Sequence, residues 1–242
     1  MRTAAALIIG NELLSGKIAE GNLVFLAREL RAIGVQLRRV VMVLDDVDTI
    51  AGDVRALAGA HDVVITSGGV GPTHDDVTVE GVALAFGAPV VISPEIERLI
   101  RGHYADRCTE GHLLMARVPE GSRLVSSPAV PWPTVVMRNV WVLPGVPEVF
   151  RMKLPHLRAE LAGDAPFVSM AVLTTLDEGD IKPLLDEVVA AHRAVEVGSY
   201  PKWHDPEYRT KLTFDGLDRP RVQAARDAFL AGLPAGTLVR TE

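Results

Sequence analysis

The chain has 242 residues with a formal net charge of -6, and 48% of its residues are hydrophobic while only 5% are aromatic. A chain of this length and composition can bury a sizeable aliphatic core without disulfides, which excludes a disordered protein. Its 25 Lys and Arg residues are dispersed, so nucleic acid is not expected as a partner, because phosphate-backbone binding normally needs a basic stripe.

Two features indicate a cytoplasmic protein. The one cysteine, Cys108, cannot form an internal disulfide, which fits a reducing compartment. The N-terminal apolar run AAALII is too short for a signal-peptide core or a membrane-spanning helix. We therefore expect no membrane partner.

The N-terminal part alternates strand and helix patterns. Continuous apolar runs at 3–10, 35–44 and 62–67 are typical of parallel strands covered on both faces. Apolar residues at helical spacing follow each run, and Thr78 and Gly87 are expected to cap and to end the third helix. This alternation predicts right-handed crossovers and a mostly parallel sheet.

The middle of the chain is less regular. A short PVVI strand leads to a helix that starts at Ser93, with proline near its first position. The runs TVVMR and VWVLPG then suggest a hairpin with its bend near Arg138 and Asn139. A helix over 147–162 follows, which Pro155 is expected to kink or divide.

Around Gly163 and Asp164 the composition becomes linker-like and a second cycle begins. The remaining patterns follow the order βαββαβ, which predicts a small ferredoxin-like α+β domain. We therefore divide the chain into an α/β domain at 1–163, which we expect to carry the functional site, and a small domain at 164–242.

The most informative stretch is ITSGGVGPTHDDVT at 65–78. Its loop follows a predicted strand, so it lies at a carboxyl edge of the sheet, where open α/β folds bind ligands. Gly68, Gly69 and Gly71 can take positive φ and let backbone N–H groups converge on an anion, and the helix that opens near Thr78 adds its dipole. This much predicts a phosphate.

Asp75 and Asp76 follow the glycines directly. Carboxylates beside a phosphate would repel it by roughly 4 kcal/mol per close pair at an effective dielectric of ~20. A divalent cation reverses that sign, and Mg²⁺ is typically held by one or two carboxylates plus substrate phosphates. Such an ion polarises a phosphoryl oxygen and delivers a nucleophilic water. The pair therefore predicts metal-assisted chemistry on a diphosphate, and the competing interpretation is a turn whose aspartates cap a helix in solvent.

Further acids follow other predicted strands. They are Glu12, Asp45, Asp46 and Glu148. Each alone is typical of a loop or a helix cap. Together, at one edge of one sheet, they indicate a site.

These residues carry a resemblance to a known family. SGGVGPTHDDVT, with GNELLSGK and Asn22 upstream, LDD at 44–46 and LPGVPE at 143–148, resembles the molybdopterin-binding-like (MoaB/MogA-type) domain that CinA, a competence/damage-inducible protein, shares with molybdenum-cofactor enzymes. LTTLDEGDIKPLLDE and GSYPKW are similar to the corresponding domain of eukaryotic FAD synthases, the FAD-hydrolase domain. The resemblance spans nearly the whole chain.

The resemblance implies a three-layer α/β/α core, a small appended domain and a nucleotide pyrophosphatase. Such a hydrolase cuts the diphosphate of FAD, ADP-ribose or a similar dinucleotide to AMP plus the other half, with divalent metal (Mg or Co) and potassium helping. It also implies a homo-oligomer, a dimer or larger.

Carried onto this chain, the resemblance makes Asp75 and Asp76 the catalytic and metal-binding residues. The residues it implies for substrate binding are Gly10, Glu12, Asn22, Asp46, Gly68, Gly69, Gly71, Pro72, Thr73 and Thr78.

Two functions stay open at this point. One is the metal-dependent hydrolase. The other is a molybdopterin- or nucleotide-binding protein, of the molybdenum-cofactor or CinA type, that does not hydrolyse its ligand. The loop GSYPKWHDPEYRTK at 198–211 either stacks its aromatics on a flavin or adenine ring or forms a polar hairpin tip.

Overall fold

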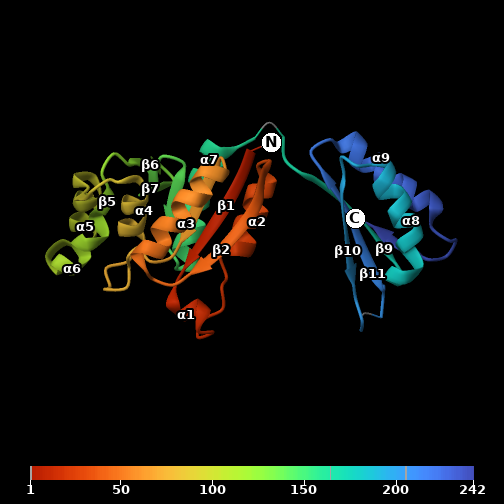
Figure 1. Ribbon diagram of the computed structural model, residues 1–242, viewed down its shortest axis with the longest axis horizontal. Coiled ribbons are helices and arrows are strands. Elements are labelled where there is room, and N and C mark those ends of the chain that lie inside the picture. The colour runs from red at the N-terminus through yellow and green to blue at the C-terminus, as the bar shows by residue number, and fades with distance from the viewer. Residues whose placement is uncertain (1, 164, 205) are drawn as a thin grey trace. The chain divides into compact units, whose positions relative to one another are not determined.

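The computed structural model describes residues 2–163, 165–204 and 206–242 (Figure 1). The linker prediction at Asp164, and Asp205 in the 198–211 loop, lie outside the described residues. The chain divides into two compact units, residues 1–164 and 165–242. None of the helices in the described ranges is long and apolar enough to cross a membrane.

The first unit is built on a six-stranded mixed sheet with the order β2-β1-β3-β8-β7-β6. The neighbouring strands β2, β1, β3 and β8 run parallel to one another. β7 pairs antiparallel with β8, and β6 pairs antiparallel with β7. The strands are β1 (Arg2–Ile9), β2 (Val35–Val43), β3 (Val63–Ser67), β6 (Arg123–Ser127), β7 (Val130–Met137) and β8 (Val140–Leu143). The predicted mostly parallel sheet is confirmed, and the four parallel strands bring their carboxyl ends to one edge.

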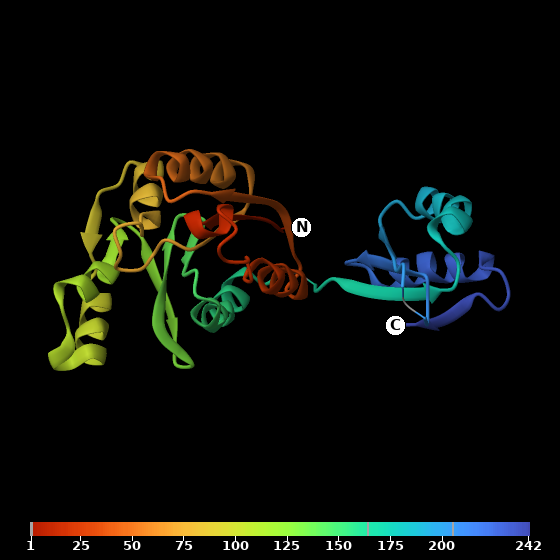
Figure 2. The same cartoon turned by 90° about the horizontal axis from the view of Figure 1, so that it is seen from below.

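Helices cover both faces of this sheet (Figure 2). They are α2 (Leu23–Ala32) and α7 (Pro147–Leu161) on one face, and α3 (Val47–Ala60) and α4 (Thr78–Phe86) on the other. Successive residues of β1 point to opposite faces, so Ile8 packs against the first pair of helices and Ile9 against the second. The uninterrupted apolar run of β1 follows from burial on both sides, and the three-layer prediction is confirmed.

Between α4 and β6 the chain forms a small subdomain of short elements. They are β4 (Val90–Ile92), α5 (Pro94–Tyr104), η1 (Ala105–Arg107), α6 (Glu110–Leu113), η2 (Leu114–Ala116) and β5 (Arg117–Pro119). β4 and β5 pair antiparallel, and Ile96, Ile100 and Val118 belong to a separate small core. Apart from α5, which Ser93 caps as predicted, these elements have three or four residues each, too few to show a hydrophobic period.

The structure bears on two expectations about helices. Thr78 does not cap α4, because Val77 holds the cap position and Thr78 turns its hydroxyl toward the glycine loop. The helix α7 runs through Pro155 to Leu161, so of the two alternatives expected there, a kink or a division, the division is wrong. Pro155 and Arg151 are both exposed, so the carbonyl group of Arg151, which lacks its helical donor, is open to water.

The second unit has the βαββαβ order and an antiparallel sheet in the order β10-β11-β9-β12, as in a ferredoxin-like domain. Its elements are β9 (Val168–Thr174), α8 (Glu178–Ala191), β10 (Glu196–Pro201), β11 (Thr210–Gly216), α9 (Arg219–Gly232) and β12 (Leu238–Thr241). Both helices pack on one face of the sheet, over Val172, Leu212 and Phe214. The α+β prediction for this part is confirmed.

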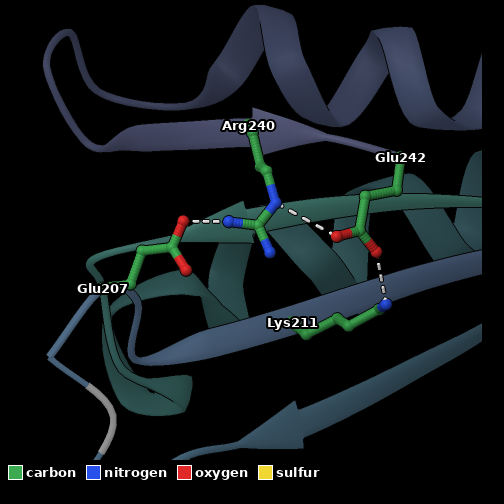
Figure 3. Close-up of polar contacts among 4 residues, drawn as sticks. All are labelled: Glu207, Lys211, Arg240 and Glu242. Atoms are coloured by element: carbon green, nitrogen blue, oxygen red, sulfur yellow. Dashed lines mark hydrogen bonds and ion pairs between the residues drawn. The ribbon is translucent and has the colours of Figure 1, made fainter.

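Charged side chains gather on the opposite face of the small sheet (Figure 3). The Nζ atom of Lys211 lies 2.6 Å from Oε2 of Glu242, and Arg240 contacts both Glu242 and Glu207. Lys211 and Arg240 are the register partners of Leu173 on its two sides, and Leu173 is 1% exposed. Exposed ion pairs contribute little by themselves, whereas long charged side chains beside a buried leucine can shield it with their aliphatic stems, as the register of Lys211 and Arg240 with Leu173 allows.

We predict that Leu173→Ala destabilises the second unit by about 2–5 kcal/mol, because truncation leaves a cavity under the charged network. Leu238→Ala is the matched control, since Leu238 is 47% exposed on the adjacent strand and its truncation should cost less than about 1 kcal/mol. Chemical denaturation followed by circular dichroism measures both. Equal effects of the two substitutions would show that Leu173 is not a core residue.

Candidate functional site

A cavity of about 800 Å³ opens where the parallel strands end. The segments after β1, β3 and β8 contribute to its walls, and the helix α1 (Asn11–Leu14) follows β1 at this edge. The opposite wall comes from α5, η2, β7 and α7. All of the residues that line this cavity belong to the first unit.

The glycine loop after β3 is fixed by its neighbours. Gly68 has φ +108 and Gly69 has φ +64, and a Cβ on Gly68 would lie 2.1 Å from the carbonyl oxygen of Ile9. Gly68 N–H donates to the carbonyl of Leu143 at 3.2 Å. Thr78, which is fully buried, donates its hydroxyl to Gly68 O at 2.8 Å and its N–H to Gly69 O at 2.9 Å. The loop is thereby tied to β1, β8 and α4.

This loop leaves backbone donors at the cavity. Gly69, Val70 and Gly71 line it, and their N–H groups have no hydrogen-bond acceptor among the described residues. The positive φ of Gly69 belongs to the kind of local conformation that turns successive amides toward one point. Three free amides on one concave surface suit an anionic oxygen.

The two adjacent aspartates of the loop lie differently. Asp76 lines the cavity, and its Oδ2 accepts from the N–H of Thr73 at 2.8 Å and from the Thr73 hydroxyl. Asp75 is exposed outside the cavity lining, beside His74. The Thr73 hydroxyl, the backbone N–H of Asp75 and the nearby His74 ring hold the pKa of Asp75 below its ordinary value. Asp76 is therefore the aspartate placed to meet a ligand.

The carboxylates of three loops influence one another at this edge. Burial, and then the negative charges of Glu12, Asp75 and Asp76, raise the pKa of Asp45, against a hydrogen bond from Asn11 N–H at 2.8 Å. In the ranges that the structure describes, no three His, Cys, Asp or Glu side chains converge closely enough to hold a metal by themselves. These carboxylates therefore form a region of negative charge that a bound ligand or cation would have to neutralise.

Asp46, the neighbour of Asp45, has a different role. Its Oδ1 accepts from Thr49 N–H at 2.8 Å and from the Thr49 hydroxyl at 2.6 Å, so it caps α3. These bonds lower the pKa of Asp46. Glu148, in the first turn of α7, is exposed away from the cavity lining. The resemblance implies Asp46 for substrate binding, and in the structure Asp46 caps α3 outside the cavity lining while Asp45 joins the acidic group.

Asn22 connects two strand ends across the cavity wall. Its Nδ2 donates to Ser67 Oγ at 3.0 Å and to Gly145 O at 2.8 Å. The side chain is 4% exposed, yet its Oδ1 has no partner among the described residues. Buried polar atoms are nearly always paired, so this acceptor is suited to a ligand hydroxyl or amine.

The structure brings most of the predicted site residues together. Those that line the cavity are Glu12, Asn22, Gly68, Gly69, Gly71, Pro72 and Asp76. Those outside its lining are Gly10, Asp46, Thr73, Asp75 and Thr78. Two of this second group act on the first: Thr73 fixes Asp76 and Thr78 fixes the glycine loop. Gly10 donates its N–H to Val43 O at 3.1 Å and so joins β1 to the end of β2.

Sequence reasoning missed a buried lysine. Lys153 is 4% exposed and lines the cavity, and its Nζ donates to the carbonyls of Trp132 at 2.5 Å and Pro133 at 2.8 Å. Burial lowers its pKa to about 8. A signal was present, because Lys153 falls at helical spacing between the apolar Phe150 and Leu157.

We predict that Gly68→Ala destabilises the first unit by several kcal/mol, because the new Cβ would collide with the backbone of Ile9 in a left-handed conformation. Gly21→Ala, also at the cavity, has open space and should cost less than about 1 kcal/mol. Thermal and chemical denaturation compare the two. A Gly68→Ala protein as stable as Gly21→Ala would contradict the described close approach.

A second prediction concerns pH. The pKa of Lys153 is about 8 in the folded protein and 10.5 ordinarily, so between these values the folded state has lost a proton that the unfolded chain keeps. Raising the pH from 7.5 to 9.5 should therefore stabilise the wild type relative to Lys153→Met by about 1–2 kcal/mol. Urea denaturation at both pH values measures this difference. A difference that does not change with pH would mean that Lys153 titrates like an exposed lysine.

Comparisons with known proteins agree with this architecture. Residues 5–161 match the family described as "Probable molybdopterin binding domain", and residues 166–242 match "FAD synthase, middle domain". The CinA protein of Thermoplasma acidophilum, a solved structure, is 34% identical with a TM-score of 0.60, over 66% of this chain and 98% of that one.

Three curated relatives extend the likeness. A protein of Archaeoglobus fulgidus is 34% identical over 91% of this chain and 93% of its own length. A probable FAD synthase of Caenorhabditis elegans is 33% identical over 98% of this chain, which spans 51% of that relative. A CinA-like protein of Syntrophus aciditrophicus is 32% identical, over 98% of this chain and 58% of the relative. Together with the sheet topology, these matches show that the chain belongs to the molybdopterin-binding domain family, as a CinA-like member whose second unit is related to the middle domain of FAD synthase.

Proposed function

We propose that this chain is a metal-dependent nucleotide pyrophosphatase, which hydrolyses the diphosphate of FAD, ADP-ribose or a similar dinucleotide to AMP and the other half. The observation that carries the proposal is that the free amides of Gly69, Val70 and Gly71 and the carboxylate of Asp76 line one cavity. Binding a phosphate needs the amides alone. A carboxylate beside them is useful when a cation comes with the phosphate.

The donor set fits a divalent cation such as Mg²⁺ or Co²⁺. Carboxylate oxygens are hard ligands, and burial followed by the negative charges of the neighbouring carboxylates raises the pKa of Asp45, so a cation at this acidic group would be favoured. Asp76, which lines the cavity, would hold the ion together with substrate phosphate oxygens, and Asp75 would join it from outside the lining, with Asp45 and Glu12 nearby and potassium as a further cation. When bound, such an ion polarises a phosphoryl oxygen.

The residues of the chain divide the remaining work. The loop amides orient the phosphate oxygens. The hydrogen bonds that Thr73 donates to one oxygen of Asp76 fix the orientation of that carboxylate. The unpaired Oδ1 of Asn22 accepts from a ribose hydroxyl or an adenine amine. One water adds to one phosphorus, the bridging P–O bond breaks, and two phosphomonoesters leave.

Binding without hydrolysis is the second candidate. It is favoured by the family match over residues 5–161 and by the lack of a preformed three-ligand metal site among the described residues. Calorimetry with FAD or ADP-ribose in the presence and absence of Mg²⁺ separates the two functions. Tight binding that needs no metal supports the binding protein, and strictly metal-dependent binding supports the hydrolase.

We predict that the purified protein releases AMP from FAD or ADP-ribose with Mg²⁺ or Co²⁺, and that Asp76→Asn lowers the rate roughly 100-fold or more. Asparagine retains an oxygen for Thr73, so the turn is kept while the charge is lost. Asp48→Asn, at an exposed position in the first turn of α3, is the matched control and should keep the wild-type rate. Chromatographic separation of the products measures this. AMP from none of FAD, ADP-ribose and NAD, or an unchanged rate in Asp76→Asn, would sink the proposal.

A further inference from the structure

The far end of the cavity differs from the glycine loop in character. Its lining includes Ile96, Tyr104, Leu114, Met115 and Trp132, contributed by α5, η2 and β7. The ring of Tyr104 is held against the ring of His112 at 3.9 Å between centroids with 29° between planes. His103 and Arg117 also line this end, and Arg117 is paired with Glu80. The rest of the wall is apolar and includes aromatic rings, of which Tyr104 is held in place. Such a wall favours a flat, conjugated group over a sugar.

Lys153 is the one lysine of the described ranges that lines this cavity. Its ammonium group has three N–H donors, and two of them are used on the carbonyls of Trp132 and Pro133. The third donor has no acceptor among the described residues, and Lys153 forms no ion pair with any of them. A polar ligand atom at this end of the cavity would give that donor its partner.

A purely structural role does not account for a charge at this position. The two carbonyl partners belong to the proline-containing start of β7, and a neutral donor would satisfy them without the cost of burying an ammonium group. The next helical turn does this work with a neutral group: His156 contacts Thr134 Oγ1 at 2.9 Å and Val130 O at 3.1 Å, and burial lowers its pKa. Lys153 reaches the cavity and His156 does not.

We propose that Lys153 is a substrate-positioning residue, which donates a hydrogen bond to a ring carbonyl oxygen of a planar, oxo-substituted heteroaromatic ring bound at the aromatic end of the cavity. It thereby selects dinucleotides whose second half is an oxo-substituted ring, such as a flavin, over those that end in a sugar. Selection between substrates of the reaction rests on the proposed function, whereas recognition of the ring does not require hydrolysis. A cavity of about 800 Å³ lies in the upper part of the size range for ligand sites, roughly 300–1,000 Å³.

The test measures the two halves of the ligand separately and without metal. Riboflavin carries the ring but no phosphate, and AMP carries the phosphate but no oxo-substituted ring. Wild-type protein should bind riboflavin saturably in a fluorescence titration. Lys153→Met should weaken that binding roughly tenfold or more, which corresponds to one hydrogen bond to a charged donor, and should leave AMP affinity within about twofold.

Thr134→Val is the matched control. It removes the hydroxyl partner of His156 and so disturbs the same contact between α7 and β7 without changing the cavity lining. Both affinities should stay within about twofold of the wild type. The inference is overturned if the wild type does not bind riboflavin, if Lys153→Met binds it normally, or if that variant loses riboflavin and AMP affinity equally.

A measurement on the wild type covers the case in which Lys153→Met fails to fold. Labelling with acetic anhydride near pH 8, followed by mass spectrometry, should show the peptide with Lys153 protected by riboflavin and not by AMP. Equal labelling with and without riboflavin would overturn the inference. Protection of Lys153 with no AMP release from any dinucleotide would remove the proposed hydrolase and leave the recognition of the ring standing.

Discussion

The site depends on one close approach of backbone to backbone. Gly68 passes so near the carbonyl of Ile9 that no side chain fits between them, and Gly145 lies close on the other side, where its own Cβ would be 3.2 Å from the Cα atom of Gly68. The ends of β1, β3 and β8 therefore lie as close together as backbone without side chains allows. The loop amides, the Asn22 bridge and Asp76 all take their positions from this contact, because each is bonded to, or follows directly from, the segments that meet there.

Much of the fold and of the glycine loop could be predicted from the sequence, because the patterns that indicate them are local. The unbroken apolar run of β1 indicates a strand buried on both faces, and the βαββαβ order of the second unit follows from strand and helix periods that need no knowledge of other segments. The glycines of the loop and the acid pair are adjacent in sequence, so the sequence alone predicts an anion-binding loop with carboxylates beside it. The family resemblance was confirmed by matches along both units.

The parts of the candidate site that could not be predicted depend on contacts between segments that are distant in the sequence. Nothing within LDD at 44–46 tells which aspartate caps a helix and which joins the acidic group, since that is decided by Thr49 for one and by Asn11 for the other. Lys153 is likewise defined by carbonyls of β7 that lie 20 and 21 positions away in the chain. The short elements around α5 give no period, so the aromatic wall that they form could not be placed.

The cavity has two ends of different chemistry, and for the proposed hydrolase this division would have a consequence for turnover. When a ligand spans both ends, binding at one end holds the other part of the ligand at a high local concentration near the second end. Cutting the ligand between the ends removes that benefit at once, and each fragment then dissociates with the affinity of a single end. A cavity arranged in this way holds an intact bridging molecule well and its two fragments poorly, so that product release needs no separate opening motion.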